Sequence, residues 1–342
     1  MPGNTKFDTA FNRITLHTFK VRLLLCLTLS IAAICTIHAE TNNPDTSEIQ
    51  TPTELRLDVT NEPAVKLTIR QSFIFPFLQG ESPLTEGNNL AAVFSAEVTP
   101  VSLNGIGEVI WTPAAFFLLS GGGRAGSGWN MPLGNGIGIN RPVTEPDNPE
   151  APYRKSEIAG TAFDGLLWAA WGSGTVQFDL GAVIPGEWNH VLFQTRQEFR
   201  YAAYTKALGG EPWVFQNDFR ENQNGWNYQA GYVIGYYMPA SPVLDTIAFM
   251  VELYKSLYNT EEGGFWGEDL GYWIFSGLFN FSISPRFSTA LALQMHTRRN
   301  HGNRNFNLDT DYFYRDLPLE SEGGKRRLLF YRAALILNYK LR

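Results

Sequence analysis

The sequence predicts an all-β protein, an antiparallel up-and-down transmembrane β-barrel of about ten strands. Three observations predict it: apolar and polar residues alternate from residue 62 onward, Trp and Tyr recur near the ends of the apolar faces, and short connections alternate with long ones. Charged residues make up 18% of the 342 residues, below the roughly 25% typical of soluble domains. The mean hydropathy of −0.17 argues against a helical membrane protein, which needs several apolar runs of about 20 residues.

Residues 1–39 have the pattern of a secretory signal peptide. Basic residues come first, at Lys6, Arg13, Lys20 and Arg22, and an uncharged, mostly apolar run of 15 residues follows at 23–37. A basic stretch, a short apolar core and a small residue such as Ala39 at the cut define such peptides. Both cysteines, Cys26 and Cys35, lie within it. We expect residues 40–61 to form a flexible periplasmic N-terminal segment and 62–342 to form the barrel domain.

The alternation has a period of two, which is the period of a β-strand. In 226–238, one face carries Trp226, Tyr228, Ala230, Tyr232, Ile234, Tyr236 and Met238, and the other carries Asn227, Gln229, Gly231, Val233, Gly235 and Tyr237. In 328–342, one face carries Leu329, Tyr331, Ala333, Leu335, Leu337, Tyr339 and Leu341, opposite Arg332, Asn338 and Lys340. A soluble sandwich shares this pattern, but many segments span 14–20 residues, whereas sandwich strands usually span about 5–6. A barrel whose apolar face meets lipid is therefore favoured.

The connections set the expected topology. The short ones are 103–105, 185–190, 238–242 and 284–286, and the long ones are 76–88, 128–160, 206–223, 258–265 and 299–326. The ten expected strands are 62–76, 89–102, 106–127, 161–183, 188–205, 224–238, 243–257, 265–283, 286–298 and 327–341. Long loops then face outside, and both termini face the periplasm. Tight turns at Thr99-Pro100 and Thr112-Pro113 give twelve strands instead, but with the other expected strands unchanged they place 128–160 on the wrong side.

Two sets of side chains have expected roles in such a barrel. A network of charged residues is expected in the lumen, comprising Lys66, Arg70, Glu97, Asp179, Arg196, Glu198, Arg200, Glu252, Arg298, Arg332 and Lys340, with Glu108 as a further candidate. Charges in a narrow lumen must be paired or hydrated. An aromatic girdle at the membrane interface is expected from Trp226, Tyr236, Trp273 and Tyr339.

The chain resembles bacterial outer-membrane β-barrel proteins over nearly all of the predicted mature segment. The resemblance lies in the signal peptide, the alternating strands, the aromatic girdle and the final amphipathic strand. Proteins of this class usually end in an aromatic residue that the assembly machinery reads, whereas this chain ends in Tyr339-Lys340-Leu341-Arg342. The runs TPVSLNG, WTPAAFF and PGEWNHVLFQT resemble uncharacterised barrels of spirochaetes. The resemblance implies an outer-membrane location, with membrane lipid and the barrel-assembly machinery as partners.

The function expected from the sequence is a structural barrel or a narrow pathway for small solutes. A surface protein that binds host ligands through its long loops is a second hypothesis. A lipid or peptide hydrolase is a third, with candidates at His190, at His296 beside Ser276, and at His301 near Asp309 and Asp311. No serine stands in a G-x-S-x-G motif, so we expect no enzyme. The net charge of −6 gives no footprint for nucleic acid.

No cofactor or metal is expected. The acidic pairs at 261–262 and at 309 and 311 are typical of solvated loops rather than of a metal site, and no His pair has ligand spacing. The glycine run 121–128 lacks the Lys-Ser/Thr ending of a phosphate-binding loop. Its glycines are expected instead to relieve crowding in a strand.

Overall fold

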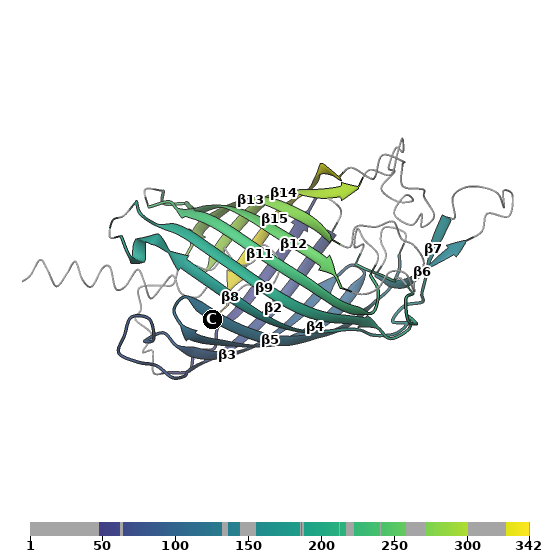
Figure 1. The fold of residues 1–342 in the computed structure, drawn as a ribbon, viewed down its shortest axis with the longest axis horizontal. Helices are drawn as coiled ribbons and strands as arrows, with labels where there is room; N and C mark the ends of the chain where they lie inside the picture. Colours follow the sequence, from purple (N-terminus) through teal and green to yellow (C-terminus); the bar gives the residue numbers. More distant parts are fainter. Residues whose placement is uncertain are drawn as a thin grey trace, which may run out of the picture.

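The fold is a closed antiparallel barrel of twelve strands (Figure 1). The computed structural model describes residues 48–61, 64–131, 136–143, 155–184, 186, 188–211, 213–216, 222–239, 241–257, 271–299 and 326–341. The predicted signal peptide lies outside the described residues. The barrel strands are β1 (Thr53–Thr60), β2 (Ala64–Pro76), β3 (Asn89–Thr99), β4 (Ser102–Ala114), β5 (Phe117–Gly128), β8 (Leu167–Asp179), β9 (Val191–Tyr204), β11 (Gly225–Tyr237), β12 (Leu244–Ser256), β13 (Gly271–Ser284), β14 (Phe287–Arg299) and β15 (Arg326–Lys340).

The expected count of ten strands is wrong, for two reasons. The segment 106–127, expected to be one strand, is divided between β4 and β5 by a tight turn at 115–116. The second additional strand is β1, which lies in the stretch expected to be a flexible lead-in. β1 pairs with β2 on one side and with β15 on the other, with Leu57 opposite both Leu67 and Leu337. This strand closes the barrel, so the sheet has no free edge.

The two prolines that suggested turns lie at the two turns of this region. Pro100 stands between β3 and β4, where the Thr99 and Ser102 hydroxyls are 2.8 Å apart and the Val101 N–H donates to Thr99 Oγ1 at 3.2 Å. Pro113 lies where the register of β4 with β5 shifts, between Trp111 and Ala114. Because proline has no N–H for the ladder, a turn or an irregular position accommodates it. The expected turn at 103–105 is wrong, since these residues are inside β4.

The extra strands change which end of the barrel holds each connection. One end, called here the loop end, holds 61–63, 100–101, 129–166, 205–224, 257–270 and 300–325. At the opposite end, called the terminal end, β1 begins and β15 ends, and the connections 77–88, 115–116, 180–190, 238–243 and 285–286 join successive strands. The expected grouping of 76–88 with the long outer loops is therefore wrong. The segment 128–160 keeps its place at the loop end because β1 and the divided strand add two strands before it.

The outer face of the barrel is apolar and exposed. Large apolar side chains with at least 43% exposure include Ile69, Phe94, Val98, Leu103, Val109, Phe193, Phe199, Trp226, Ile234, Phe249, Leu293 and Leu335. They alternate along the strands with buried polar residues such as Glu198, Ser276 and Gln294. A soluble protein rarely exposes so large an apolar surface, whereas lipid suits it.

A second, three-stranded sheet lies at the loop end. It is formed by β6 (Ile137–Val143), β7 (Lys155–Ala159) and β10 (Trp213–Phe215), in the order β10-β6-β7. Figure 1 shows β6 and β7 beyond one end of the barrel. Its apolar residues pack with the barrel in one buried cluster, comprising Ile137, Ile139, Leu167, Tyr204, Ala207, Trp213 and Phe215.

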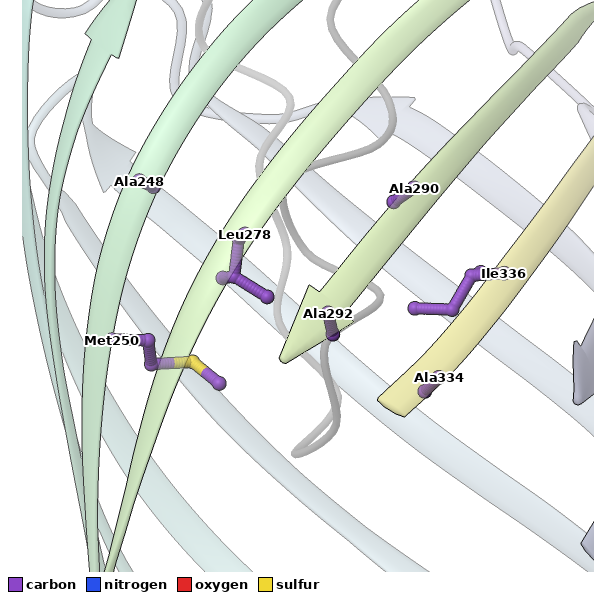
Figure 2. Packing of buried hydrophobic residues seen from close by; sticks show 7 residues of the cluster. All are labelled: Ala248, Met250, Leu278, Ala290, Ala292, Ala334 and Ile336. Atoms are coloured by element: carbon purple, nitrogen blue, oxygen red, sulfur yellow. The ribbon is translucent and has the colours of Figure 1, made fainter. Parts of the chain in front are cut away.

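Part of the inner wall is apolar. A cluster called here the apolar patch comprises Ala248, Met250, Leu278, Ala290, Ala292, Ala334 and Ile336, each at most 6% exposed. Figure 2 shows that these side chains come from four adjacent strands, β12 to β15. Four of its seven residues are alanines.

In the described part of the chain, no helix has the length and apolarity that a bilayer crossing requires.

Candidate functional site in the barrel interior

A chain of charged side chains crosses the inner wall from β1 to β5. Arg56 Nε lies 2.6 Å from Asp58 Oδ1, and Lys66 Nζ lies 3.4 Å from Asp58 Oδ2. Lys66 Nζ is also 3.5 Å from Glu97 Oε1, and Arg124 Nη2 is 2.9 Å from Glu97 Oε2. Cations and anions therefore alternate around four strands, and each carboxylate is shared between two cations.

A second group of ion pairs lies on β9 and β4. Glu198 accepts from Arg196 Nη2 at 2.6 Å and from Arg200 Nε at 2.8 Å. Arg196 Nη2 is also 3.8 Å from Glu108 Oε1. The Glu198 side chain is 0% exposed and that of Glu108 is 2% exposed. At such depth each carboxylate requires its partners, because an uncompensated buried charge is strongly unfavourable.

Trp171 on β8 extends this group toward the loop end. Its indole N–H donates to Glu108 Oε1 at 3.3 Å, and the Arg200 guanidinium lies 4.7 Å from its ring centroid. The ring occupies space beside Gly122, where an added Cβ would come within 2.6 Å of the indole and 2.7 Å of the Gly107 carbonyl oxygen. The glycine at position 122 is therefore required by a close approach, as expected for part of the glycine run.

The interior of β12 carries a further buried carboxylate, that of Glu252, which bonds to a tyrosine of the same strand. Glu252 Oε1 accepts from the Tyr254 hydroxyl at 2.9 Å, and the Tyr254 ring stacks on Tyr272 with centroids 4.8 Å apart. Glu252 is 5% exposed. It lies at the boundary between the ion pairs and the apolar patch, because Met250 precedes it on the same face.

A bulge in β15 brings an additional aromatic ring into the interior. Gln294 pairs with Arg332 and Met295 with Phe330, so Tyr331 is the extra residue. Tyr331 stacks on the buried His296 at 4.9 Å, and the Arg332 guanidinium lies 4.6 Å from the Tyr331 ring. The expected position of Tyr331 on the apolar outer face is therefore wrong. The bulge reverses the alternation for the residues of β15 that precede Arg332.

Arg332 is held by neutral groups. Its Nε donates to Gln294 Oε1 at 2.7 Å, and Gln294 Nε2 donates to Ser276 Oγ at 2.8 Å. The hydroxyl of Ser276 thus takes part in the interior hydrogen-bond network beside His296.

A small cavity of about 20 Å³ lies between β9, β11 and β12. It is lined by Gln194, Arg196, Gln229, Gly231, Val233, Met250 and Glu252. Within the described part of the chain, Arg196 Nε and Gln194 Nε2 make no hydrogen bond. A space of this size with several polar partners suits a water molecule.

The structure places the other expected lumen residues outside these clusters. Arg70 and Lys340 flank Glu54 of β1 across the ladder. Asp179 lies at the terminal end, where it accepts from the Gly181 N–H at 2.9 Å and lies 3.1 Å from His190 Nδ1. The backbone of Arg298 pairs with Arg327, and its side chain lies outside the described part.

Three members of the ion-pair chain were not predicted from the sequence. Arg56 and Asp58 belong to β1, whose alternation with Leu55 and Leu57 was the available signal. Arg124 stands inside the glycine run 121–128, whose glycines predicted relief of crowding and gave no sign of an interior charge.

The four expected girdle residues lie near the two ends of their strands. Trp226 and Trp273 are near the loop end, and Tyr236 and Tyr339 are near the terminal end. Trp226 is 53% exposed and Tyr339 is 43% exposed. On the outer face at the loop end, Trp168, Tyr201 and Trp226 form a continuous row, with successive ring centroids 5.4 and 5.5 Å apart.

The residues considered for catalysis do not form a recognisable set. His190 contacts Asp179 at the terminal end, whereas His296 stacks on Tyr331 and Ser276 bonds to Gln294. His301, Asp309 and Asp311 lie outside the described residues, as do Glu261 and Glu262. Among described residues, no cluster of three or more His, Cys, Asp or Glu side chains suits a metal ion.

The closed antiparallel barrel, its apolar outer face and its polar interior define the class: an outer-membrane β-barrel protein. No model of a known protein family matches the chain, and no characterised protein matches it by sequence.

Several solved barrels resemble the chain in fold. The KdgM porin has 8% identity and a TM-score of 0.35, with 85% of this chain and 99% of that chain covered. The NanC porin has 8% identity and a TM-score of 0.38, covering 84% and 98%. Omp33 of Acinetobacter baumannii has 8% identity and a TM-score of 0.32, covering 86% and 100%. The class of the protein follows from its own barrel rather than from these distant likenesses.

Proposed function

We propose that the protein is an integral outer-membrane barrel that provides a narrow pathway for small solutes. The observation that carries this proposal is the charged inner wall, whose side chains stay partly accessible. Lys66 is 26% exposed, Arg200 21% and Arg124 19%, although all of them face the interior. Accessible charges inside a barrel favour water in the lumen, and water is the medium a small solute needs.

The number of strands supports a narrow pathway. Eight strands give an interior that side chains just fill, whereas open porins have about 16–18. Twelve strands lie between these limits. The buried Glu198 and the apolar patch occupy part of the interior, which favours small solutes over large ones.

The proposed orientation puts the loop end outside the cell and both termini in the periplasm. This matches the usual arrangement, in which short turns face the periplasm and longer loops face outward. The connections 129–166 and 205–224, and those at 257–270 and 300–325, then face outward.

Reconstitution into planar bilayers tests the proposal. The purified, folded protein is expected to give small, discrete conductance steps in KCl, with mobility on gels that shifts on heating. Stable insertion without any conductance would contradict the pathway and favour a purely structural barrel. Release of the protein from cells without detergent would contradict the membrane location itself.

A further inference from the structure

The strand β10 reaches from the loop end down onto the charged inner wall. The guanidinium of Arg124 lies 5.2 Å from the ring centroid of Phe215, the last residue of β10. The next residue, Gln216, donates from Nε2 to the Ser102 hydroxyl of β4 at 2.7 Å. β10 therefore contacts β5 and β4, although it belongs to the connection between β9 and β11.

The position of β10 is fixed by packing. Trp213, Val214 and Phe215 are 4%, 2% and 8% exposed. Trp213 and Phe215 share a buried cluster with Leu167 of β8 and Tyr204 of β9. The Trp213 indole N–H donates to Asn224 Oδ1 at 2.9 Å, and Asn224 Oδ1 also accepts from the Tyr204 N–H at 2.8 Å. The strand is thus held to the barrel wall on both of its sides.

Arg124 links this strand to the ion pairs of the lumen. Its guanidinium bonds to Glu97 at 2.9 Å, and Phe215 lies against the same guanidinium. An aromatic face attracts a cation and also shields it from solvent. Toward the loop end, the Phe215 ring therefore partly covers the charge of Arg124.

We propose that β10 forms the constriction of the pathway and that Phe215 determines which solutes pass Arg124. This inference rests on the proposed function. The Phe215 ring narrows the entrance of the lumen at the loop end, on the side of β4, β5, β8 and β9. It also limits the access of small anions to the guanidinium of Arg124. Pore width and the charges that line it are the properties that set selectivity in channels.

Single-channel recording on Phe215→Ala tests the constriction. We expect the conductance in KCl to rise roughly twofold, because a wider entrance offers less resistance to ions. The reversal potential in a KCl gradient should shift toward that of chloride, because the guanidinium of Arg124 becomes more accessible than its 19% exposure in the wild type. The largest polyethylene glycol that blocks the current from the loop end should also increase.

Two further variants keep the test independent of folding. Gln216→Ala removes the bond to Ser102 and leaves the Phe215 cluster intact, so a smaller change in the same direction is expected. Phe199→Ala removes the same ring from the outer face, where Phe199 is 53% exposed, and should leave conductance unchanged. Heat-modifiable mobility verifies that each variant is folded.

The outcomes separate this inference from the proposed function. A conducting wild type, with conductance and selectivity unchanged in folded Phe215→Ala and Gln216→Ala, overturns only the role of β10. A silent wild type with a conducting Phe215→Ala supports β10 as a closure of the lumen. Silence of every folded variant, wild type included, overturns the pathway and the constriction together.

Discussion

The two halves of the inner wall are built differently. From β1 to β9 the wall carries ion pairs that share carboxylates, such as Glu97 and Glu198. From β12 to β15 it carries the apolar patch, and the nearby Arg332 donates its hydrogen bond to the neutral side chain of Gln294. The comparison shows that one barrel combines two ways of filling its interior: paired charges on one half of the wall, and close-packed, mostly small apolar residues on the other.

The largest effect is expected from breaking the most deeply buried ion pairs. Glu198→Gln leaves Arg196 and Arg200 without their shared carboxylate, and removing one partner of a buried pair costs about 3–5 kcal/mol. Urea unfolding in lipid vesicles measures the loss. Glu81→Gln, at an exposed position of the terminal end, is the control and should have little effect. A loss below about 1 kcal/mol would mean that water, not Glu198, compensates these arginines.

Truncating a residue of the apolar patch should lower the stability of the barrel nearly as much, because it removes close packing rather than an ion pair. Leu278→Ala removes a side chain that is 2% exposed, and such truncations cost about 2–5 kcal/mol. Leu293→Ala is the matched change on the outer face, where Leu293 is 46% exposed. Equal losses for the two variants would show that the patch is not closely packed.

An intermediate effect is expected where Trp171 packs on β5. In Gly122→Ala the new Cβ meets the indole at 2.6 Å, and overpacking of this kind costs about 1–3 kcal/mol. Gly172→Ala, where nothing lies within 4 Å of an added Cβ, should be neutral. Trp fluorescence reports the displaced ring. Equal stability of both variants would contradict the requirement for glycine at 122.

The smallest effect is expected at the accessible end of the ion-pair chain. Lys66 lies 3.4 and 3.5 Å from its two carboxylates and is 26% exposed, and accessible pairs contribute about 0.2–1 kcal/mol. Lys66→Met should therefore lower stability slightly, and less so in high salt. A large loss that salt does not reduce would place Lys66 with the buried group around Glu198.

Long strands with a strong local alternation were predicted correctly, and short or irregular ones were not. The segment 226–238 alternates without interruption, and β11 spans Gly225–Tyr237. β1 alternates equally well at Leu55, Leu57 and Val59 but is short, and its polar surroundings resembled a linker. The bulge at Tyr331 left no signal in the sequence, because it depends on how β15 pairs with β14.

The sequence predicts which charged residues face the lumen on one strand, but not which residues of other strands they contact. Alternation alone assigns Arg196, Glu198 and Arg200 to one face of a strand. It does not show that Arg196 reaches Glu108 on β4, because β5 and β8 lie between β9 and β4 in the barrel. Nor does it show that Phe215 covers Arg124, because β10 belongs to a separate sheet whose placement depends on tertiary packing.

The sequence by itself determined that the chain forms an antiparallel barrel with an apolar exterior, since a period of two assigns each side chain to a face. Tertiary structure decided the strand number, the end at which each loop lies and the pairing of the interior charges. The reason is physical: closure requires β1 to pair with both β2 and β15, and only a closed barrel brings distant strands across one lumen.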